Sequence, residues 1–312
     1  MPRIVYLVPN PEFPSGGNKM AFRHVEALVS LGFDAVVRAP PSGPLPRWFR
    51  HEAPVERTSG APRPDDILVF PDDAAAELNA AAALPNTKVV FVQNPYSSVL
   101  GLPAIPPERA AVYRTFMTCS DGVSAWVRRY VDHDEVATVP AFADERLFRP
   151  AAKARVIACT PRKRRNELRV IRHLYARLRP GCDYRWALID GRTEAETASA
   201  LASASVFLSL ARLEGMSLTI AEAMASGCLI AGFTGLGARE YANADNGLWV
   251  GEDDCEAAAH ALVRAVELAE AHGPEAGAMR AGALAAAGGW THAAFVRTLD
   301  DYWRARLTLC KS

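Results

Sequence analysis

Short apolar runs alternate with helix-like segments along this chain, and this alternation constrains the fold more than any other feature. The first run, Ile4 to Val8, leads into a turn-rich loop and an amphipathic segment from about Lys19 to Leu31. Gly32, which follows, is a common C-terminal stop for such a helix. Because the runs are apolar throughout, they are typical of parallel strands in a sheet covered on both faces. Further strands are predicted at 33–39, 66–70 and 88–94, and a short strand passes into a helix over 117–131.

The same alternation starts again after residues 136–150, a Pro-punctuated and irregular stretch. An Ala-rich segment, 256–285, then predicts one or two helices with breaks at glycines. We therefore expect an α/β protein with two Rossmann-like, doubly wound domains that face each other across a cleft, over 1–150 and 151–290. The second series comprises strands at 154–160, 184–190, 205–210, 228–233 and 248–250, and helices at about 166–178, 194–204 and 218–226.

Length and charge agree with two domains and argue against some partners. The chain has 312 residues, of which 50% are hydrophobic, and this is too long for one ordinary core. Lys plus Arg and Asp plus Glu both number 35, so there is no basic excess for a phosphate backbone, and we expect no nucleic acid partner. No apolar run is long enough for a signal peptide or a membrane span, so we expect a soluble, cytoplasmic protein. A peripheral membrane contact through basic or aromatic side chains stays open.

The cysteines and histidines indicate no metal site. The cysteines form no CxxC pair and four of them lie in apolar or strand-like stretches, which is typical of buried, reduced thiols. The seven histidines show no metal-ligand spacing. The cysteines are Cys119, Cys159, Cys182, Cys228, Cys255 and Cys310.

The segment 205–240 carries the strongest functional signal, because it predicts a strand, a loop, a helix and another strand with two glutamates. Glu214 falls in the loop at the carboxyl end of a strand, where open α/β sheets bind ligands. Glu222 lies about one turn into the next helix, whose free N-terminal N–H groups suit a diphosphate. A carboxylate that accepts two hydrogen bonds from a vicinal diol can hold a ribose or a hexose. We therefore expect the two glutamates to flank an anion site.

This stretch resembles the retaining glycosyltransferases of family 4, which have the two-Rossmann architecture called GT-B. The family's motif, commonly EGFxLxxxEAMAxG, stands here as EGMSLTIAEAMASG from Glu214 to Gly227. Gly235 and Glu240 match the family's downstream pattern. Weaker matches are Gly16-Gly17 after the first strand, the junction 136–150 and the PRKR cluster at 161–164.

The resemblance implies roles for residues of the second domain. Glu222 would bind the ribose hydroxyls and Glu214 the transferred sugar. Arg162 and Lys163 would neutralise the diphosphate and, with Glu214, form the catalytic set. Family members place these cations about five residues apart, whereas here they are adjacent, so which residue from Arg162 to Arg165 contacts the diphosphate stays open. The other donor-binding residues implied are Arg164, Gly215 and, through amides to the distal phosphate, Met216, Ser217 and Leu218.

The resemblance also implies roles in the first domain. Gly16 and Gly17 would let the N-terminal loop close over the diphosphate. Many family members carry a His where this chain has Gln93, and this departure leaves the sugar and the acceptor open. Asn18, Gln93 and Asn94 would face the acceptor. In this fold the last helix crosses back, so we expect residues 291–312 to pack on the first domain through the helix's aromatic residues.

The implied reaction is a retaining transfer of a sugar from a nucleotide-sugar donor to an acceptor hydroxyl, with no metal or other cofactor. Arg162, Lys163 and the helix N-terminus would stabilise the charge on the leaving diphosphate. The leaving phosphate oxygen would take the acceptor's proton, and no protein nucleophile is assigned. Domain closure would exclude water. The expected acceptor is a bacterial surface polysaccharide or lipid-linked glycan, which would place the enzyme at the inner face of the membrane.

Other interpretations need no donor. Thr219-x-x-Glu222 is a capping box, Glu214 fits a solvated loop, and the basic residues 162–165 fit an exposed helical turn. Asp132-His133-Asp134 fits the DxD pattern that binds metal in the other glycosyltransferase fold, but it follows a helix and is interpreted as a surface turn.

Two rival functions stay open: a nucleotide-sugar-binding protein without transfer, and a sugar-nucleotide epimerase on the same fold. A dinucleotide-dependent dehydrogenase is disfavoured because no GxGxxG follows a strand.

Overall fold

Two α/β units make up the chain, and the computed structural model describes residues 2–131 and 135–309. Unit 1 comprises residues up to Ala141 together with those from Ala293 onward, and unit 2 comprises Phe142–His292. The chain therefore passes between the units twice. The surface turn expected at Asp132-His133-Asp134 and the thiol of Cys310 lie outside the described residues.

The stretch just before residue 150 belongs to unit 2, although the sequence placed it with the first domain. The Ala143 N–H donates to the Trp290 carbonyl at 2.9 Å, and the His292 N–H donates to Glu145 Oε2 at 2.7 Å. Phe148 is buried. These contacts join the segment by which the chain enters unit 2 to the segment by which it leaves. An irregular, Pro-rich sequence does not reveal such contacts.

The sheet of unit 1 consists of parallel strands in the order β3-β2-β1-β4-β5-β6-β7. Ile4 of β1 is in register with Ala35 of β2 on one side and with Ile67 of β4 on the other. The chain thus builds outward in both directions from β1, and such a reversal opens a crevice at the carboxyl ends of the flanking strands. The strands are β1 (Ile4–Leu7), β2 (Ala35–Ala39), β3 (Val55–Arg57), β4 (Ile67–Pro71), β5 (Thr87–Val92), β6 (Phe116–Thr118) and β7 (Val136–Thr138).

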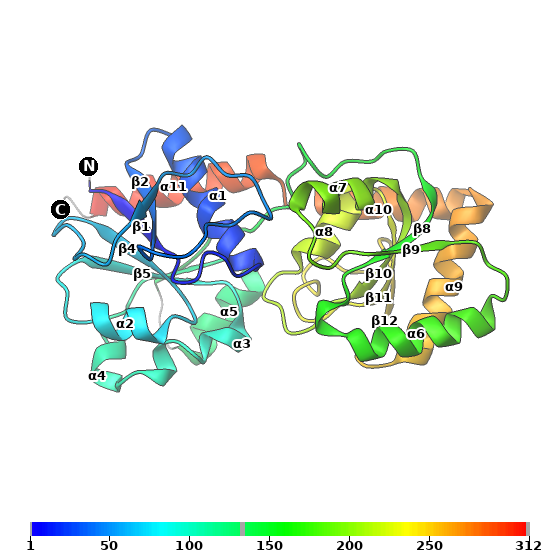
Figure 1. Cartoon of the computed structure of the whole chain (residues 1–312), viewed down its shortest axis with the longest axis horizontal. Coiled ribbons are helices and arrows are strands. Elements are labelled where there is room, and N and C mark those ends of the chain that lie inside the picture. The colour runs from blue at the N-terminus through cyan, green and yellow to red at the C-terminus, as the bar shows by residue number, and fades with distance from the viewer. Residues whose placement is uncertain (1, 132–134, 310–312) are drawn as a thin grey trace. The chain divides into compact units, whose positions relative to one another are not determined.

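Helices cover both faces of this sheet, with α1 and α11 on one face and α2 and α4 on the other (Figure 1). In α11 the side chains of Phe295, Leu299, Trp303 and Leu307 recur at every fourth position and are buried, as helical spacing predicts. The Trp303 ring lies 6.5 Å from the ring of Tyr6 in β1. The helices of this unit are α1 (Gly16–Ser30), α2 (Ala75–Ala81), α3 (Pro95–Ser98), η1 (Leu102–Ala104), α4 (Pro107–Ala110), α5 (Asp121–Tyr130) and α11 (His292–Leu309).

The sheet of unit 2 is also parallel, in the order β12-β11-β10-β8-β9. From β8 the chain adds β9 on one side and then crosses to β10 on the other, so the strand order reverses between β8 and β10. This reversal predicts a ligand crevice at the carboxyl ends of these two strands. The strands are β8 (Ala154–Cys159), β9 (Arg185–Leu188), β10 (Ala204–Leu210), β11 (Leu229–Phe233) and β12 (Leu248–Val250).

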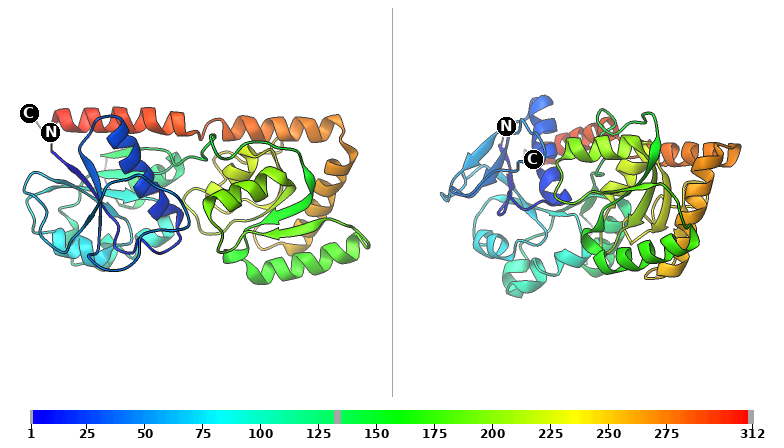
Figure 2. Two further views of the ribbon diagram at one scale, coloured as in Figure 1. Left: turned by 45° about the horizontal axis from the view of Figure 1, so that its top comes forward. Right: turned by 45° about the vertical axis from the view of Figure 1, so that its right-hand side comes forward.

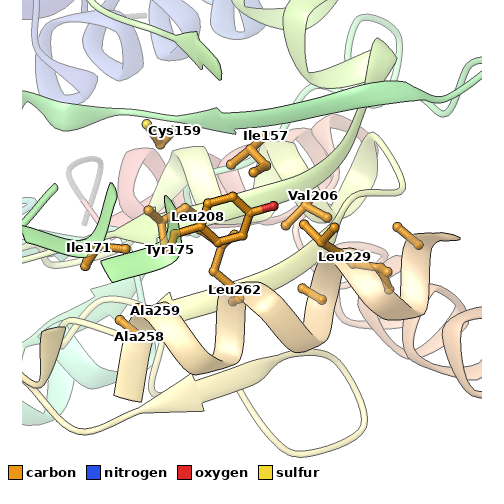
Figure 3. Close-up of a cluster of buried hydrophobic side chains, with 14 of the residues drawn as sticks. Ile157, Cys159, Ile171, Tyr175, Val206, Leu208, Leu229, Ala258, Ala259 and Leu262 are labelled. Carbon is orange, nitrogen blue, oxygen red and sulfur yellow. The ribbon is translucent and has the colours of Figure 1, made fainter. Parts of the chain in front are cut away.

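In unit 2, α6 and α9 lie on one face of the sheet, and α7, α8 and α10 lie on the other (Figure 1, Figure 2). The core between the sheet and the first pair of helices holds Ile157 and Val206 of the strands against Ile171 and Leu262 of the helices (Figure 3). The helices are η2 (Pro161–Lys163), α6 (Arg165–Leu178), α7 (Glu194–Ser203), α8 (Leu218–Ala225), α9 (Cys255–Ala271) and α10 (Pro274–Ala287).

Candidate functional site

Two loops meet at the carboxyl ends of β8 and β10, where the strand order of unit 2 reverses. Lys163 ends the short helix that follows β8, and Glu214 lies in the loop that follows β10. The Lys163 Nζ lies 2.8 Å from Glu214 Oε1. The Ser217 hydroxyl donates to the other oxygen of this carboxylate at 2.5 Å. The fold therefore brings a predicted cation and a predicted carboxylate into contact at the edge where a ligand is expected.

The loop that carries Glu214 is held in an uncommon backbone conformation. Leu213 has a φ of 50°, in the left-handed region that residues other than glycine rarely adopt, and such strain clusters at functional sites. The Leu213 carbonyl accepts a hydrogen bond from Lys163 Nζ at 3.4 Å. The side chains of Lys163 and Glu214 keep 28% and 26% of their exposure, so a ligand in solvent can reach both.

Helix α8 begins beside this ion pair. Ser217 is its N-cap, but the Ser217 side chain accepts no hydrogen bond from the first turn, and its hydroxyl donates to Glu214. The N–H groups of Thr219 and Ile220, in that first turn, have no acceptor inside the helix. The N-terminus of α8 thus carries amide donors that this side chain does not cap.

Two of the amides assigned to the distal phosphate are engaged within the protein. The Ser217 N–H donates to the Gly237 carbonyl at 3.2 Å, and the Leu218 N–H donates to the Met216 carbonyl at 3.1 Å. Both amides thus have partners inside the protein in this structure, and the assignment of Ser217 and Leu218 as phosphate donors stays a prediction. Gly215 and Met216 stay in the same loop, between Glu214 and the helix.

Glu222 is buried on α8, with 5% exposure. The capping-box interpretation requires Thr219 at the N-cap, but α8 begins at Leu218 with Ser217 as N-cap, so that interpretation is excluded. A buried carboxylate is costly unless polar groups surround it. The negative charges of Glu222 and Glu214 both contribute to raising the pKa of the Tyr241 phenol.

Tyr241 is a residue of this site that the sequence analysis missed. Its hydroxyl donates to the Ser217 carbonyl at 2.9 Å, and the residue is buried. Burial, followed by the negative charges of Glu214, Glu240 and Glu222, raises the pKa of the Tyr241 phenol well above its ordinary value, so the hydroxyl keeps its proton. In the sequence Tyr241 stands as one more aromatic residue after Glu240, and no spacing marks it.

Arg164 is a correction to the predicted donor site. Its side chain is only 1% exposed, its guanidinium donates to the Ala211 carbonyl at 3.1 Å, and it stacks over the Phe233 ring at 4.3 Å. It also donates to carboxylates on α6 and in the loop before α9: those of Glu167, Glu252 and Asp253. Arg164 therefore ties the loops of unit 2 together and is not available to a diphosphate.

The neighbours of Arg164 differ in their environments. Arg165 is exposed and pairs with Asp190 at 2.6 Å. Arg162 is exposed and Lys163 is half-buried, on the short helix directly after β8. A diphosphate-binding role for Arg162 and Lys163 stays a prediction.

In unit 1, Gly16 and Gly17 form the first turn of α1, which Ser15 caps through the Asn18 N–H at 3.1 Å. The sequence placed this pair in a loop before a helix that starts at Lys19, and that placement is wrong because the cap lies earlier. Gln93 Nε2 donates to the Gly17 carbonyl at 3.3 Å, and a Cβ at Gly17 would lie 3.1 Å from Gln93 Nε2. The two predicted positions are therefore in contact, and glycine permits the close approach.

Asn18 and Asn94 have local structural roles. The Asn18 side-chain amide donates to the carbonyls of Asn10 and Phe13 and so holds the loop after β1. The Asn94 side chain accepts from the Tyr96 N–H and caps α3. A role toward an acceptor stays a prediction for both.

Asp72, directly after β4, is a second residue that the sequence analysis missed. It is buried, and its Oδ2 accepts hydrogen bonds from the Asn94 N–H and the Ser97 hydroxyl, both at 3.4 Å. Burial, with a further contribution from the charge of Asp73, raises the pKa of the Asp72 carboxyl to about 7. A group that titrates near neutral pH therefore lies beside Gln93 and Asn94 at the carboxyl edge of unit 1.

Among residues 2–131 and 135–309, no three His, Cys, Asp or Glu side chains are grouped so that they could hold a metal ion. Over the same residues, no helix is both long and apolar enough to cross a membrane.

Residues 140–267 match the family model described as glycosyl transferases group 1, and this range holds Lys163, Glu214, Glu222 and Tyr241. An alpha-1,6-glucosyltransferase from Actinobacillus pleuropneumoniae serotype 7 is 32% identical over 127 residues, which cover 38% of this chain and 38% of that protein. The match therefore spans less than half of the relative's length.

Solved structures resemble the whole chain in fold. A glycosyltransferase from Rickettsia africae has a TM-score of 0.71 at 13% identity and covers 98% of both chains. Anabaena HepE in complex with UDP-glucose has a TM-score of 0.75 at 12% identity, over 97% of this chain and 99% of that one. Residues 140–267 thus form a group 1 glycosyltransferase domain, and the two parallel sheets with their helices give the chain the α/β fold of GT-B glycosyltransferases.

Proposed function

We propose that this protein is a retaining glycosyltransferase of family 4 type that moves a sugar from a nucleotide-sugar donor to an acceptor hydroxyl. UDP-glucose is the donor we propose first. This choice is supported by a fold neighbour that was crystallised with UDP-glucose and by a relative of the matched domain that is called a glucosyltransferase.

The observation that carries this proposal is the contact between Lys163 and Glu214. In a nucleotide sugar the sugar is bonded directly to the distal phosphate, so a cation for the phosphate and a carboxylate for the sugar hydroxyls must be close neighbours. Lys163 Nζ and Glu214 Oε1 lie 2.8 Å apart, beside the N-terminus of α8 and at the reversal point of the sheet. The ion pair, the helix N-terminus and the reversal point of the sheet each have an ordinary structural explanation. Together they match the layout of one nucleotide sugar.

The proposed roles follow from this layout. Glu214 holds the sugar hydroxyls and Glu222 the ribose hydroxyls. Arg162 and Lys163, with the first-turn amides of α8, bind the diphosphate. When the bond from the anomeric carbon to the phosphate oxygen breaks, its electron pair stays on the diphosphate, and these groups stabilise that charge. The acceptor oxygen then bonds to the anomeric carbon on the same face, and its proton passes to the released phosphate oxygen.

The remaining roles are proposed on the family resemblance. The cations and the helix N-terminus supply the positive charge at the diphosphate, so the transfer needs no metal. Gly16 and Gly17 allow the N-terminal segment to close over the diphosphate, and Asn18, Gln93 and Asn94 face the acceptor. We propose a glycan or lipid-linked acceptor in bacterial surface polysaccharide synthesis, which would place the protein in the cytoplasm with a peripheral contact at the inner membrane.

Calorimetric titration with UDP, GDP, dTDP and ADP tests the donor site. We expect UDP to bind, and Glu222→Gln to weaken UDP binding about 10- to 100-fold, because a charged acceptor of hydrogen bonds from the ribose is lost. Glu256→Gln changes an exposed glutamate at the start of α9 in the same unit and should leave the affinity unchanged. UDP binding that is equally strong in both variants would contradict the role of Glu222.

Product analysis by NMR separates transfer from the rival functions. Incubation of UDP-glucose with candidate glycan acceptors should yield a product with an α-glucosidic bond, because retention keeps the donor's configuration. A UDP-sugar epimer formed without acceptor would show an epimerase instead. UDP binding without consumption of UDP-glucose under any acceptor condition would favour the binding protein.

A further inference from the structure

Ser217, the N-cap of α8, is held through each of its polar groups by a different partner. Its N–H donates to the Gly237 carbonyl at 3.2 Å, and its carbonyl accepts from the Tyr241 hydroxyl at 2.9 Å. Its own hydroxyl donates to Glu214 at 2.5 Å. The residue is 1% exposed. The segment after β11 thus holds both the backbone N–H and the backbone carbonyl of Ser217.

This fixation gives Ser217 a backbone unlike that of the other serine N-caps in the chain. Ser15 and Ser120 have ψ angles of 147° and 163°, and the side chain of each accepts a hydrogen bond from the first turn of its helix. Ser217 has a ψ of 82° and its side chain makes no capping bond. Serine favours the capping geometry when the backbone is extended. Asp254, at a ψ of 84°, still caps α9 through its longer side chain, whereas the shorter Ser217 side chain makes no capping bond at this ψ and contacts Glu214 instead.

Tyr241 is itself held firmly in place. Its backbone carbonyl accepts from Asn246 Nδ2 at 2.6 Å, and its ring lies 5.8 Å from the Trp290 ring in an edge-to-face arrangement. Its phenol keeps its proton at any ordinary pH, since burial and the surrounding carboxylates raise its pKa. The hydroxyl can therefore act steadily as a donor to the Ser217 carbonyl.

We propose that Tyr241 is a positioning residue that holds Ser217 away from the first turn of α8, and so keeps that turn open for the distal phosphate of the donor. This inference rests on the proposed function. Without the Tyr241 hydroxyl, Ser217 can relax toward the extended backbone of Ser15 and Ser120. Its hydroxyl oxygen then caps α8 by accepting a hydrogen bond from a first-turn amide meant for the phosphate.

The test compares Tyr241→Phe with Tyr113→Phe. Tyr113 is the matched control, because it is also buried and its hydroxyl also donates to a backbone carbonyl, that of Leu78, but in unit 1. Dissociation constants for UDP and UMP are measured by calorimetry on both variants and the wild type. We expect Tyr241→Phe to bind UDP about three- to tenfold more weakly while its affinity for UMP, which lacks the distal phosphate, stays unchanged. Tyr113→Phe should bind both like the wild type.

A double-mutant cycle with Ser217→Ala distinguishes positioning from a general loosening of the fold. Alanine has no hydroxyl that could cap α8, so Tyr241→Phe should weaken UDP binding much less in the Ser217→Ala background. The inference is overturned if Tyr241→Phe binds UDP like the wild type, if it loses UDP and UMP affinity equally, or if its effect is undiminished in that background. A wild-type protein that binds no UDP would instead refute the proposed function, and this inference with it.

Discussion

Lys163 and Arg164 are adjacent in the chain but lie in opposite environments. The Lys163 ammonium remains partly exposed against Glu214, whereas the Arg164 guanidinium is buried over Phe233 and bonded on several sides. The short helix η2 turns the two side chains apart. A cluster of four basic residues in sequence therefore contains one structural residue, and only the backbone geometry decides which residue that is.

Asp72 makes a pH-dependent contribution to stability. Its folded-state pKa of about 7 lies above its ordinary value of 3.8, so between these values the folded chain keeps a proton that the unfolded chain has lost. The stability that this site contributes is therefore present below pH 4 and is lost as the pH rises through 7. Asp72→Asn should remove this loss, which amounts to on the order of 4 kcal/mol.

The measurement is urea unfolding of wild type and Asp72→Asn at pH 5 and pH 8. The gain in unfolding free energy from the substitution should be larger at pH 8 than at pH 5. Asp65→Asn, which changes an exposed carboxylate just before β4, should show no such difference. An Asp72→Asn gain that is the same at both pH values would show that this carboxyl is already ionised in the folded protein at pH 5.

Most strands and the long helices could be predicted from apolar runs and periodicity, whereas the two short edge strands of unit 1 could not. The predicted strand at 248–250 matches β12, and the strands predicted at 154–160 and 228–233 contain β8 and β11. The edge strands β3 and β7 have three residues each and are only partly buried, so no apolar run marks them. Within the site, the motif marked Glu214 and the basic cluster marked Lys163, but the contact between them and the contacts of Tyr241 and Asp72 arise from folding and leave no spacing in the sequence.

The break in the Ala-rich segment falls at one of its glycines, Gly273, which is the N-cap of α10. Helix α9 ends at Ala271, its C-cap His272 adopts a left-handed φ of 49°, and α10 begins at Pro274. The other two glycines of the segment, Gly277 and Gly282, lie inside α10. They have different surroundings: a Cβ at Gly282 would lie 2.3 Å from the Asp245 carbonyl oxygen, whereas a Cβ at Gly277 would meet nothing within 4 Å.

Alanine substitutions in α10 should therefore have opposite effects. Gly277→Ala should stabilise the protein by about 0.5–1 kcal/mol, because alanine loses less backbone entropy in a helix. Gly282→Ala should destabilise it by about 1–3 kcal/mol, because the helix must move away from the loop at Asp245. Thermal unfolding by calorimetry measures both. A melting temperature that rises in both variants would show that this loop yields without cost.

At the scale of the whole chain, each unit repeats the same plan of a parallel sheet whose strand order reverses next to its first strand. Alternating strands and helices predicted this plan, because covered parallel strands have few other arrangements. The boundary between the two units was harder to predict. Residues 142–150 carry no periodicity, and their place in unit 2 depends on contacts with Trp290 and His292. The matched glycosyltransferase domain and the candidate site both belong to this second unit.

The central claim is that unit 2 binds a nucleotide sugar at the carboxyl ends of β8 and β10. A crystal structure of the protein soaked with UDP-glucose tests it most directly. We predict the diphosphate within hydrogen-bond distance of Lys163 and the first-turn amides of α8, the ribose at Glu222 and the glucose at Glu214. A nucleotide bound elsewhere, with the Lys163–Glu214 ion pair untouched, would contradict the claim.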